Sequence, residues 1–562
     1  MSVDTNPPSD EEIKTFFLNA PAVPDGTFEF ALVLGGTVSA GAYTAGAVDF
    51  LIEALDCLAD APDAPKHKVV LKLIAGTSGG GVNAAIAARA LAYRYPHVSR
   101  STPTPSEGTG NPFYDIWVNQ LRLSELLDPS DLDETVVSLL NGAPIDRGAK
   151  TIIEFTGDGA VAREWVAAPL RVILTATNVR GVPYKIDMGD GLSQTYINHA
   201  DYMRFAVKYP HQNLAQARPD EFVLTFDGES APQVWEDFSV SARATAAFPL
   251  GFPPRELSRP TDHYRYRPVL VLGATARRNS YFVPLPDWRA MAEGGAAPDQ
   301  WRFLAVDGGA TDNEPIELAR TALAGLLGRN PRAPNKANRA VWLIDPFAGE
   351  TDLGPAQRTV FINDFGAIAS ALTQQTRYDT SDLELAADQK VFSRFMLTPT
   401  REDSEGNRLD GAAAIASSGM GAFIGFASAD FMRFDYLLGR ANCRQFLREQ
   451  FVLGERNPLF SSWTKEQRAR FRAASSPRML PIVPLVGAAA AQQEVESWPV
   501  GRLDPETYRA GVEMRFKKIF ERQIAGRLAK AFAAPVAWLT ERDVANYVIN
   551  AMNASLDKAA LK

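Results

Sequence analysis

The sequence predicts a three-layer α/β protein, with a central, mostly parallel sheet flanked by helices, followed by a mainly helical C-terminal region. Three apolar runs carry this prediction, at residues 28–34, 69–75 and 301–306. Each run is followed by a glycine-rich turn and then by a segment in which apolar residues recur at helical spacing. Strands that alternate with helices in this way build a parallel sheet with helices on its faces.

Ser78 is the leading candidate for a catalytic nucleophile. It follows the second apolar run and precedes an alanine-rich helix expected over residues 81–95. A serine in a tight turn between a strand and a helix has the geometry of a nucleophile elbow, in which glycines leave room for a strained backbone. The alternative is an ordinary strand-to-helix turn with an incidental serine. The turn reads Gly76, Thr77, Ser78, Gly79 and Gly80.

The positions of the histidines argue against a histidine base for this serine. An α/β-hydrolase triad runs in the order serine, acid, histidine, so its acid precedes its histidine. No convincing acid in a glycine frame precedes the later histidines, and none of the five histidines follows residue 263. A carboxylate that takes the serine proton directly is therefore the next option. The histidines are His67, His97, His199, His211 and His263.

Asp307 is the candidate carboxylate. It ends the third apolar run and is followed by Gly308 and Gly309, which allow a sharp turn and keep bulk away from the acid. A helix is expected over residues 316–327, with a proline near its first turn. The alternative role for Asp307 is to cap the turn between the strand and the helix.

The loop after the first apolar run is the candidate oxyanion site. It lacks the lysine of a phosphate-binding P-loop, and no acid follows at the end of a second strand as a dinucleotide fold requires. In a serine hydrolase, the backbone N–H groups of such a loop stabilise the negative oxygen of the tetrahedral intermediate. The loop reads Gly35, Gly36, Thr37, Val38, Ser39, Ala40 and Gly41.

These motifs, in this order, resemble those of the patatin-like phospholipase family. Two further stretches, 174–178 and 242–254, resemble the family's strand after the nucleophile helix and its proline-rich segment. The resemblance implies hydrolysis of acyl lipids, such as phospholipids, by a dyad of Ser78 and Asp307, with no cofactor and no metal. It places Gly35, Gly36, Thr37, Val38, Gly41 and Gly79 at the oxyanion and substrate-binding site.

One departure from the family pattern concerns the oxyanion loop. The family loop usually reads Gly-Gly-Gly-x-Arg-Gly, whereas here Thr37 and Val38 replace two glycines and Ala40 replaces the arginine. β-Branched residues are poor hosts for a positive φ, should the loop require one. Two alternatives to a lipid hydrolase therefore stay open: a non-catalytic lipid-binding or scaffold protein of the same fold, and a soluble esterase or thioesterase.

The length of 562 residues predicts more than one compact unit. We expect a mobile N-terminal arm over residues 1–27, a catalytic domain over 28–340, and a mainly helical region over 341–562. Polar insertions near 187–236 and 255–300 are expected to build a cap beside the active site, because loops over strand ends carry function.

Composition excludes several classes of protein. A net charge of −8 argues against a nucleic-acid partner, and the two cysteines offer neither a disulfide framework nor a metal site. The N-terminus lacks the basic and apolar stretches of a signal peptide, and no segment is expected to span a membrane. A cytoplasmic location is expected on these grounds, with contact to membranes at most peripheral.

Residues 506–532 predict a basic amphipathic helix. Such a helix can lie on an anionic membrane surface, or it can pack its apolar stripe on its own protein, which is the commoner case. The stripe consists of Val512, Phe516, Ile519, Phe520, Ile524, Leu528 and Phe532. The cations are Arg509, Arg515, Lys517, Lys518, Arg522, Arg527 and Lys530.

Overall fold

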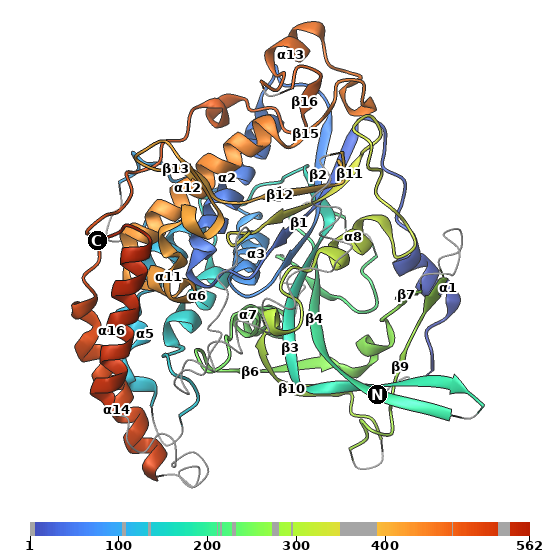
Figure 1. Ribbon diagram of the computed structural model, residues 1–562. Coiled ribbons are helices and arrows are strands. Elements are labelled where there is room, and N and C mark those ends of the chain that lie inside the picture. Colours follow the sequence, from blue (N-terminus) through green and yellow to red (C-terminus); the bar gives the residue numbers. More distant parts are fainter. Residues whose placement is uncertain are drawn as a thin grey trace.

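The structure is a computed structural model of the chain (Figure 1). It describes residues 6–103, 108–132, 136–190, 192–210, 212–213, 216–226, 232–271, 280–293, 296–348, 390–474, 476–525 and 540–562.

A ten-stranded sheet forms the centre of the molecule, with seven strands in the order β12-β11-β1-β2-β3-β10-β6. The five strands from β12 to β3 are parallel, whereas β10 and β6 are antiparallel to their neighbours. The strands are β1 (Thr27–Leu34), β2 (Lys68–Gly76), β3 (Val166–Gly189), β6 (Arg255–Pro260), β10 (Gln300–Asp307), β11 (Arg339–Ile344) and β12 (Arg394–Leu397). Strands β4 (Leu192–Val207) and β9 (Leu285–Pro286) pair with β3, and β5 (Phe222–Leu224) pairs with β4. The three apolar runs are thus β1, β2 and β10, and the predicted fold class is confirmed.

Helices cover both faces of the sheet, which makes three layers (Figure 1). Along β1, Phe28, Phe30 and Leu32 join the large core cluster on the side of α2, α3 and α12. Ala31 and Val33 point to the opposite side and pack with α8. Side chains on a strand alternate between faces, so an all-apolar strand is what a sheet buried on both sides requires. The covering helices are α2 (Gly41–Asp60), α3 (Gly79–Ala90), α8 (Ile316–Ala324) and α12 (Ala429–Glu449).

The C-terminal region packs directly on the helix that follows the oxyanion loop. Helices α2 and α12 cross with their backbones in close contact, because neither Gly46 nor Gly439 carries a side chain at the crossing. A Cβ on Gly46 would overlap the carbonyl of Tyr436, and one on Gly439 would overlap that of Tyr43. Strand β12 adds to the same sheet through β11, so residues beyond 340 extend the core that begins at β1.

A buried ionic network joins these two helices. Asp49 on α2 accepts hydrogen bonds from the Arg440 guanidinium and the Tyr436 hydroxyl of α12, and is bonded to His97 and Asn111. Burial acts to raise the pKa of Asp49, but His97 and Arg440 outweigh it and hold that pKa at about 2. The carboxylate is therefore charged and fully surrounded by donors.

The N-terminal segment is packed where it is described. Helical turns α1 (Asp10–Ile13) and η1 (Lys14–Leu18) bury Ile13, Phe17 and Leu18 against Leu326. Burial of these apolar side chains favours the packed arrangement of residues 10–18, and the mobile arm over residues 1–27 stays a prediction. Residues 1–5 lie outside the described residues. The predicted boundaries at 27 and 340 stay a prediction.

The basic helix packs on its own protein over the described residues. Helix α14 (Arg509–Ala525) buries Val512 and Ile519, and packs beside α16 (Glu541–Lys558). The sequence pattern placed Arg515 among the cations on the solvated face of the helix. In the structure it does not lie on that face. It is fully buried and donates to Asp131 and to the carbonyls of Asp128 and Leu139. The part of the predicted helix from 526 to 532 lies outside the described residues.

One described helix, over residues 38–60, is long and apolar enough to cross a bilayer by length and composition. Most of its residues are buried inside the protein, where α2 packs against the sheet and α12. The apolar character of this helix is therefore typical of a helix that is buried on all sides in a protein core.

We expect Arg440→Ala to lower the free energy of unfolding by roughly 3–5 kcal/mol, because it leaves the Asp49 carboxylate buried without its main cation. Chemical denaturation at neutral pH measures the loss. Arg448→Ala, which removes a half-exposed arginine from the same helix, is the control and is expected to change stability by less than about 1 kcal/mol. Equal stabilities of the two variants would contradict the role of the network.

Candidate active site

Ser78 stands at the junction of β2 and α3 in a strained backbone conformation. It has φ +53° and ψ −129°, a region that residues with side chains rarely adopt. Its N–H donates to the Thr245 hydroxyl at 3.0 Å, and the N–H of Thr77 donates to the Leu34 carbonyl at 3.1 Å. Gly76 ends β2 in contact with the turn, since a Cβ there would lie 2.6 Å from the Gly80 carbonyl oxygen.

The turn is seated directly on the end of β1. A Cβ on Gly80 would overlap the carbonyl oxygens of Leu34 and Gly35, and one on Gly79 would overlap the Thr37 hydroxyl. Any side chain at these two positions would push the turn away from the neighbouring loop. The glycines therefore fix the distance between Ser78 and the predicted oxyanion loop.

The predicted oxyanion loop lies beside Ser78, and Val38 in it has a positive φ of +47°. Gly35 donates to the Ile344 carbonyl at 3.2 Å, and Gly36 faces Ser78 so closely that a Cβ would lie 3.5 Å from the serine Cβ. A β-branched residue at positive φ costs of order 1–3 kcal/mol, so the surroundings must hold Val38 in place.

The rest of the loop leads into α2. Thr37 is 1% exposed, and residues Val38–Ala40 form the short 3₁₀ helix η2. Gly41 begins α2 against the ring of Trp117, which would overlap a Cβ at that position. Gly35, Gly36, Thr37 and Val38 are therefore adjacent to Ser78 or to its turn, whereas Gly41 contacts Trp117.

Asp307 ends β10 and lies close to Ser78. It is 3% exposed, and burial raises the pKa of its carboxyl to about 6, although hydrogen bonds from the Ser78 side chain and the Gly309 N–H lower it. The Gly309 bond is 2.8 Å long. Gly308 packs against Thr175, where a side chain would not fit. A carboxyl with this pKa is ionised at neutral pH and still basic enough to accept a proton.

Two residues at the site carry a role that the sequence did not indicate. Thr245 holds the Ser78 backbone, as described above, and its position at the end of α7 (Pro232–Thr245) shows only in three dimensions. Asn313 lies between Gly36 of the oxyanion loop and Gly309 after the aspartate. A Cβ on Gly36 would overlap the side-chain oxygen of Asn313, and a Cβ on Gly309 would lie 2.8 Å from it. Neither residue belongs to a periodic or glycine-framed pattern.

The described histidines are bonded elsewhere or buried apart from this site. His199 bonds the Asn178 carbonyl at 2.7 Å, His97 bonds Asp49, and His67 bonds the Ile482 carbonyl. Burial lowers the pKa of His263 to about 3, so it is neutral at physiological pH. His211 lies outside the described residues. Within the part of the chain that is described, no group of three or more His, Cys, Asp and Glu side chains is arranged to hold a metal ion.

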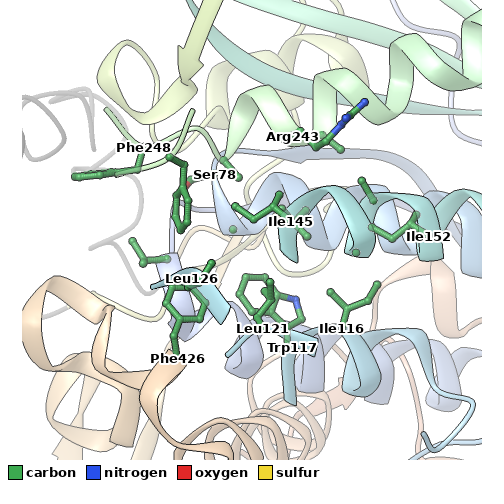
Figure 2. A pocket seen from close by; sticks show the side chains of 18 residues that line it. Ser78, Ile116, Trp117, Leu121, Leu126, Ile145, Ile152, Arg243, Phe248 and Phe426 are labelled. Carbon is green, nitrogen blue, oxygen red and sulfur yellow. The ribbon is translucent and has the colours of Figure 1, made fainter. Parts of the chain in front are cut away.

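An apolar pocket runs away from Ser78. Figure 2 shows Ser78 and Phe248 at one end and Ile152 at the other. Apolar side chains line nearly all of it, and Arg243 is the one charged group among the described lining residues. The apolar lining consists of Val38, Val82, Ile116, Trp117, Leu121, Leu126, Ile145, Ala149, Ile152, Ala242, Ala246, Phe248, Phe252 and Phe426.

The pocket is covered by several segments of the chain. Its walls come from residues 116–152, from residues 242–252, and from Phe426 of the C-terminal region. No described residue of the insertions at 187–236 and 255–300 lines the pocket, and the predicted cap stays a prediction. Their long hairpin, β3 with β4, instead extends the sheet (Figure 1).

The fold and the site define an α/β protein with a serine on a strand–turn–helix and a buried aspartate close to it. The family model described as patatin-like phospholipase matches residues 32–320. The chain belongs to the patatin-like phospholipase family.

Two other comparisons give similarities of different strength. An uncharacterized protein of Sinorhizobium fredii, y4iI, is 30% identical over 534 residues, which cover 86% of this chain and 74% of that protein. The crystal structure of VipD from Legionella pneumophila aligns with 95% of this chain and 92% of its own, at 8% identity and a TM-score of 0.17. That likeness is too weak to support a statement about the fold.

The raised pKa of Asp307 predicts a pH-dependent stability. Because the folded pKa of about 6 exceeds the usual value of 3.8, the folded protein holds the proton more tightly. This contribution is fully present below about pH 4 and is lost as the pH rises through 6. Asp307→Asn is therefore expected to be more stable than wild type above pH 7, by on the order of 2–3 kcal/mol.

Denaturation curves of wild type and Asp307→Asn between pH 4 and pH 8 measure this difference. Taking the difference between the two proteins removes the titration of Asp435, whose pKa burial also raises, to about 7. The difference in the free energy of unfolding between the two proteins is expected to decrease towards pH 4. A gap that does not change with pH would show that Asp307 is not destabilised by burial.

Proposed function

We propose that this chain is a lipid acyl hydrolase that cleaves fatty-acyl esters through Ser78 and Asp307. The observation that carries the proposal is the place of Ser78 close to the buried Asp307 carboxyl, whose pKa it lowers, at one end of an apolar pocket. Membership of the patatin-like phospholipase family supports the broader class, hydrolysis of lipids. The dyad is the finer part of the proposal.

The proposed reaction begins when the Ser78 oxygen attacks the ester carbonyl while its proton passes to Asp307. The carbonyl oxygen becomes negative, and backbone N–H groups of the Gly36–Val38 loop and of Gly79 stabilise it. The positive end of the α3 dipole lies next to Ser78 and acts in the same direction. Asp307 then returns the proton to the leaving alcohol, which gives an acyl-enzyme.

Water releases the fatty acid in the second half of the reaction. Asp307 takes a proton from water, the hydroxide attacks the acyl carbonyl, and Ser78 leaves with that proton. No step requires a metal or an organic cofactor, so chelators are not expected to inhibit. The apolar pocket holds the acyl chain, because an alkyl chain gains roughly 0.8 kcal/mol per buried CH₂.

Exposed apolar side chains next to the pocket favour a lipid over a soluble ester. Leu250, between the lining residues Phe248 and Phe252, is 57% exposed. Leu139 is 39% exposed and donates its N–H to the Leu250 carbonyl at 2.8 Å. Large apolar side chains that remain in water beside a binding site are typical of surfaces that contact other apolar matter. We propose that they contact the lipid surface from which the substrate is taken.

The dyad predicts non-additive losses of activity. Ser78→Ala and Asp307→Asn are each expected to lower kcat/KM on a short soluble ester by at least about 10³-fold, and the double variant is expected to be little worse. Steady-state kinetics with folding checked by thermal melts makes the measurement. His199→Ala and His263→Ala are controls that should retain most activity. Full activity in either dyad variant would refute the proposal.

The lipid preference predicts a separation between two substrates. Leu250→Glu with Leu139→Glu is expected to reduce hydrolysis of phospholipid vesicles by about tenfold or more, since charges oppose contact with the bilayer surface, while hydrolysis of the soluble ester persists. Leu192→Glu, at an exposed leucine of the β3–β4 hairpin, is the matched control. Wild type that cleaves only soluble esters would identify an esterase instead, and wild type that cleaves neither would identify a non-catalytic protein.

A further inference from the structure

A segment of the C-terminal region reaches the active site from outside the part of the chain that matches the family. It comprises the helical turns α11 (Gly419–Ala422) and η9 (Ile424–Ala427). Both lie about a hundred residues beyond the family match at 32–320. Both contact η2, the short helix of the oxyanion loop. We refer to residues 419–427 as the bracing segment.

The bracing segment is bonded to the oxyanion loop through Ser39. The Ser39 hydroxyl donates to the carbonyl of Ala422, and both residues are at most 1% exposed. Gly425 packs on the same hydroxyl, so closely that a Cβ on this glycine would overlap it. Ser39 follows Val38 directly, so this contact acts one residue away from the positive φ in the loop.

The bracing segment has a strained backbone that its surroundings hold. Met420, Gly421 and Ala422 have φ values of +53°, +60° and +68°. Consecutive residues in this region are costly unless other contacts determine them. The Met420 N–H donates to the Ser555 hydroxyl on α16 at 3.2 Å, which ties the segment to the C-terminal helix.

Asp435 of α12 anchors the chain just before the segment. Its carboxylate accepts from the N–H of Ala416 at 2.7 Å, from the N–H of Ser417 at 3.1 Å, and from the Ser417 hydroxyl. Ser428 caps the start of α12 just after the segment. The segment is thus fixed at both ends by one helix, which itself packs on α2.

The same segment forms part of the wall of the pocket. Phe426 lines the pocket beside Ser78 and Leu126 (Figure 2). The ring of Phe423 lies 5.7 Å from that of Phe248 and 6.2 Å from that of Phe252, two other lining residues. Contact with the loop and contact with the pocket therefore come from one rigid piece of chain.

We propose that Ser39 is a positioning residue for the reaction, and that the bracing segment acts through it. The bond to the Ala422 carbonyl holds η2, and with it the strained Val38, so that the loop's N–H groups point at the oxygen that becomes negative. The inference rests on the proposed hydrolase function and assigns the C-terminal region a part in it. Ser39 itself touches neither the substrate nor the reacting atoms.

Ser39→Ala tests the inference with a short soluble ester. The variant is expected to lower kcat roughly 10- to 100-fold with KM changed by less than about twofold, because a misplaced oxyanion donor weakens only the transition state. Gly425→Ala displaces the same hydroxyl from the other side and is expected to give the same pattern. Thr261→Ala is the matched control, since it removes a buried hydroxyl that donates to a backbone carbonyl, that of Pro298, away from the loop and the bracing segment.

Hydrogen exchange supplies a readout that does not depend on turnover. Amides of residues 36–41 are expected to exchange faster in Ser39→Ala than in Thr261→Ala at equal thermal midpoints. If Ser39→Ala and Gly425→Ala both keep the wild-type kcat, or both keep the wild-type rates of amide exchange, this inference is wrong. The proposed hydrolase function would not be affected by that result. If wild type and Ser78→Ala are equally inactive, the proposed hydrolase fails and this inference fails with it.

Discussion

The contact between the Ser78 turn and the end of β1 determines the geometry of the whole site. Gly79 and Gly80 let the turn rest on the backbone of Leu34 and Gly35, with no side chain between them. Because β1 and β2 are parallel neighbours, their carboxyl ends lie together, and the serine and the oxyanion loop meet at one edge of the sheet. Asp307 reaches this edge from β10 on the other side of β3. The sheet therefore sets the spacing of all three parts.

This geometry stores strain that has to be balanced by packing around it. Ser78 and Val38 both have positive φ, and Asp307 is a carboxylate with little solvent around it. Each of these features destabilises the folded protein by itself. The compensating contacts come from many directions: Thr245 from α7, Trp117 beside Gly41, and α12 along α2. A site of this kind requires a large core, and the central cluster runs from Phe28 to Leu561.

Sequence reasoning found the parts of the site that have a local signature. An apolar run, a glycine turn and a helix are contiguous, so β1, β2 and β10 and the residues at their ends could be located before the structure was known. Val38, a β-branched residue where the family loop has glycine, has the positive φ that such residues resist. Contacts made at a distance left no such signal. Three features depend on contacts between residues more than a hundred positions apart. They are the walls of the pocket, the burial of Arg515 and the bond from Ser39 to Ala422.

The altered glycine loop and the C-terminal region can be understood together. Glycine at position 38 would adopt the positive φ of the loop freely, whereas Val38 makes the same conformation costly; Thr37 has a φ of −137° and carries no such cost. The loop then depends on contacts from outside, and Gly425 and Ala422 supply them at the neighbouring Ser39. The similarity to the Sinorhizobium fredii protein covers 86% of this chain, and so it extends well past the family match at 32–320. On the proposal made above, the C-terminal region and the oxyanion loop depend on each other. Without the bracing segment, Val38 would relax to a negative φ and the loop would adopt a different conformation.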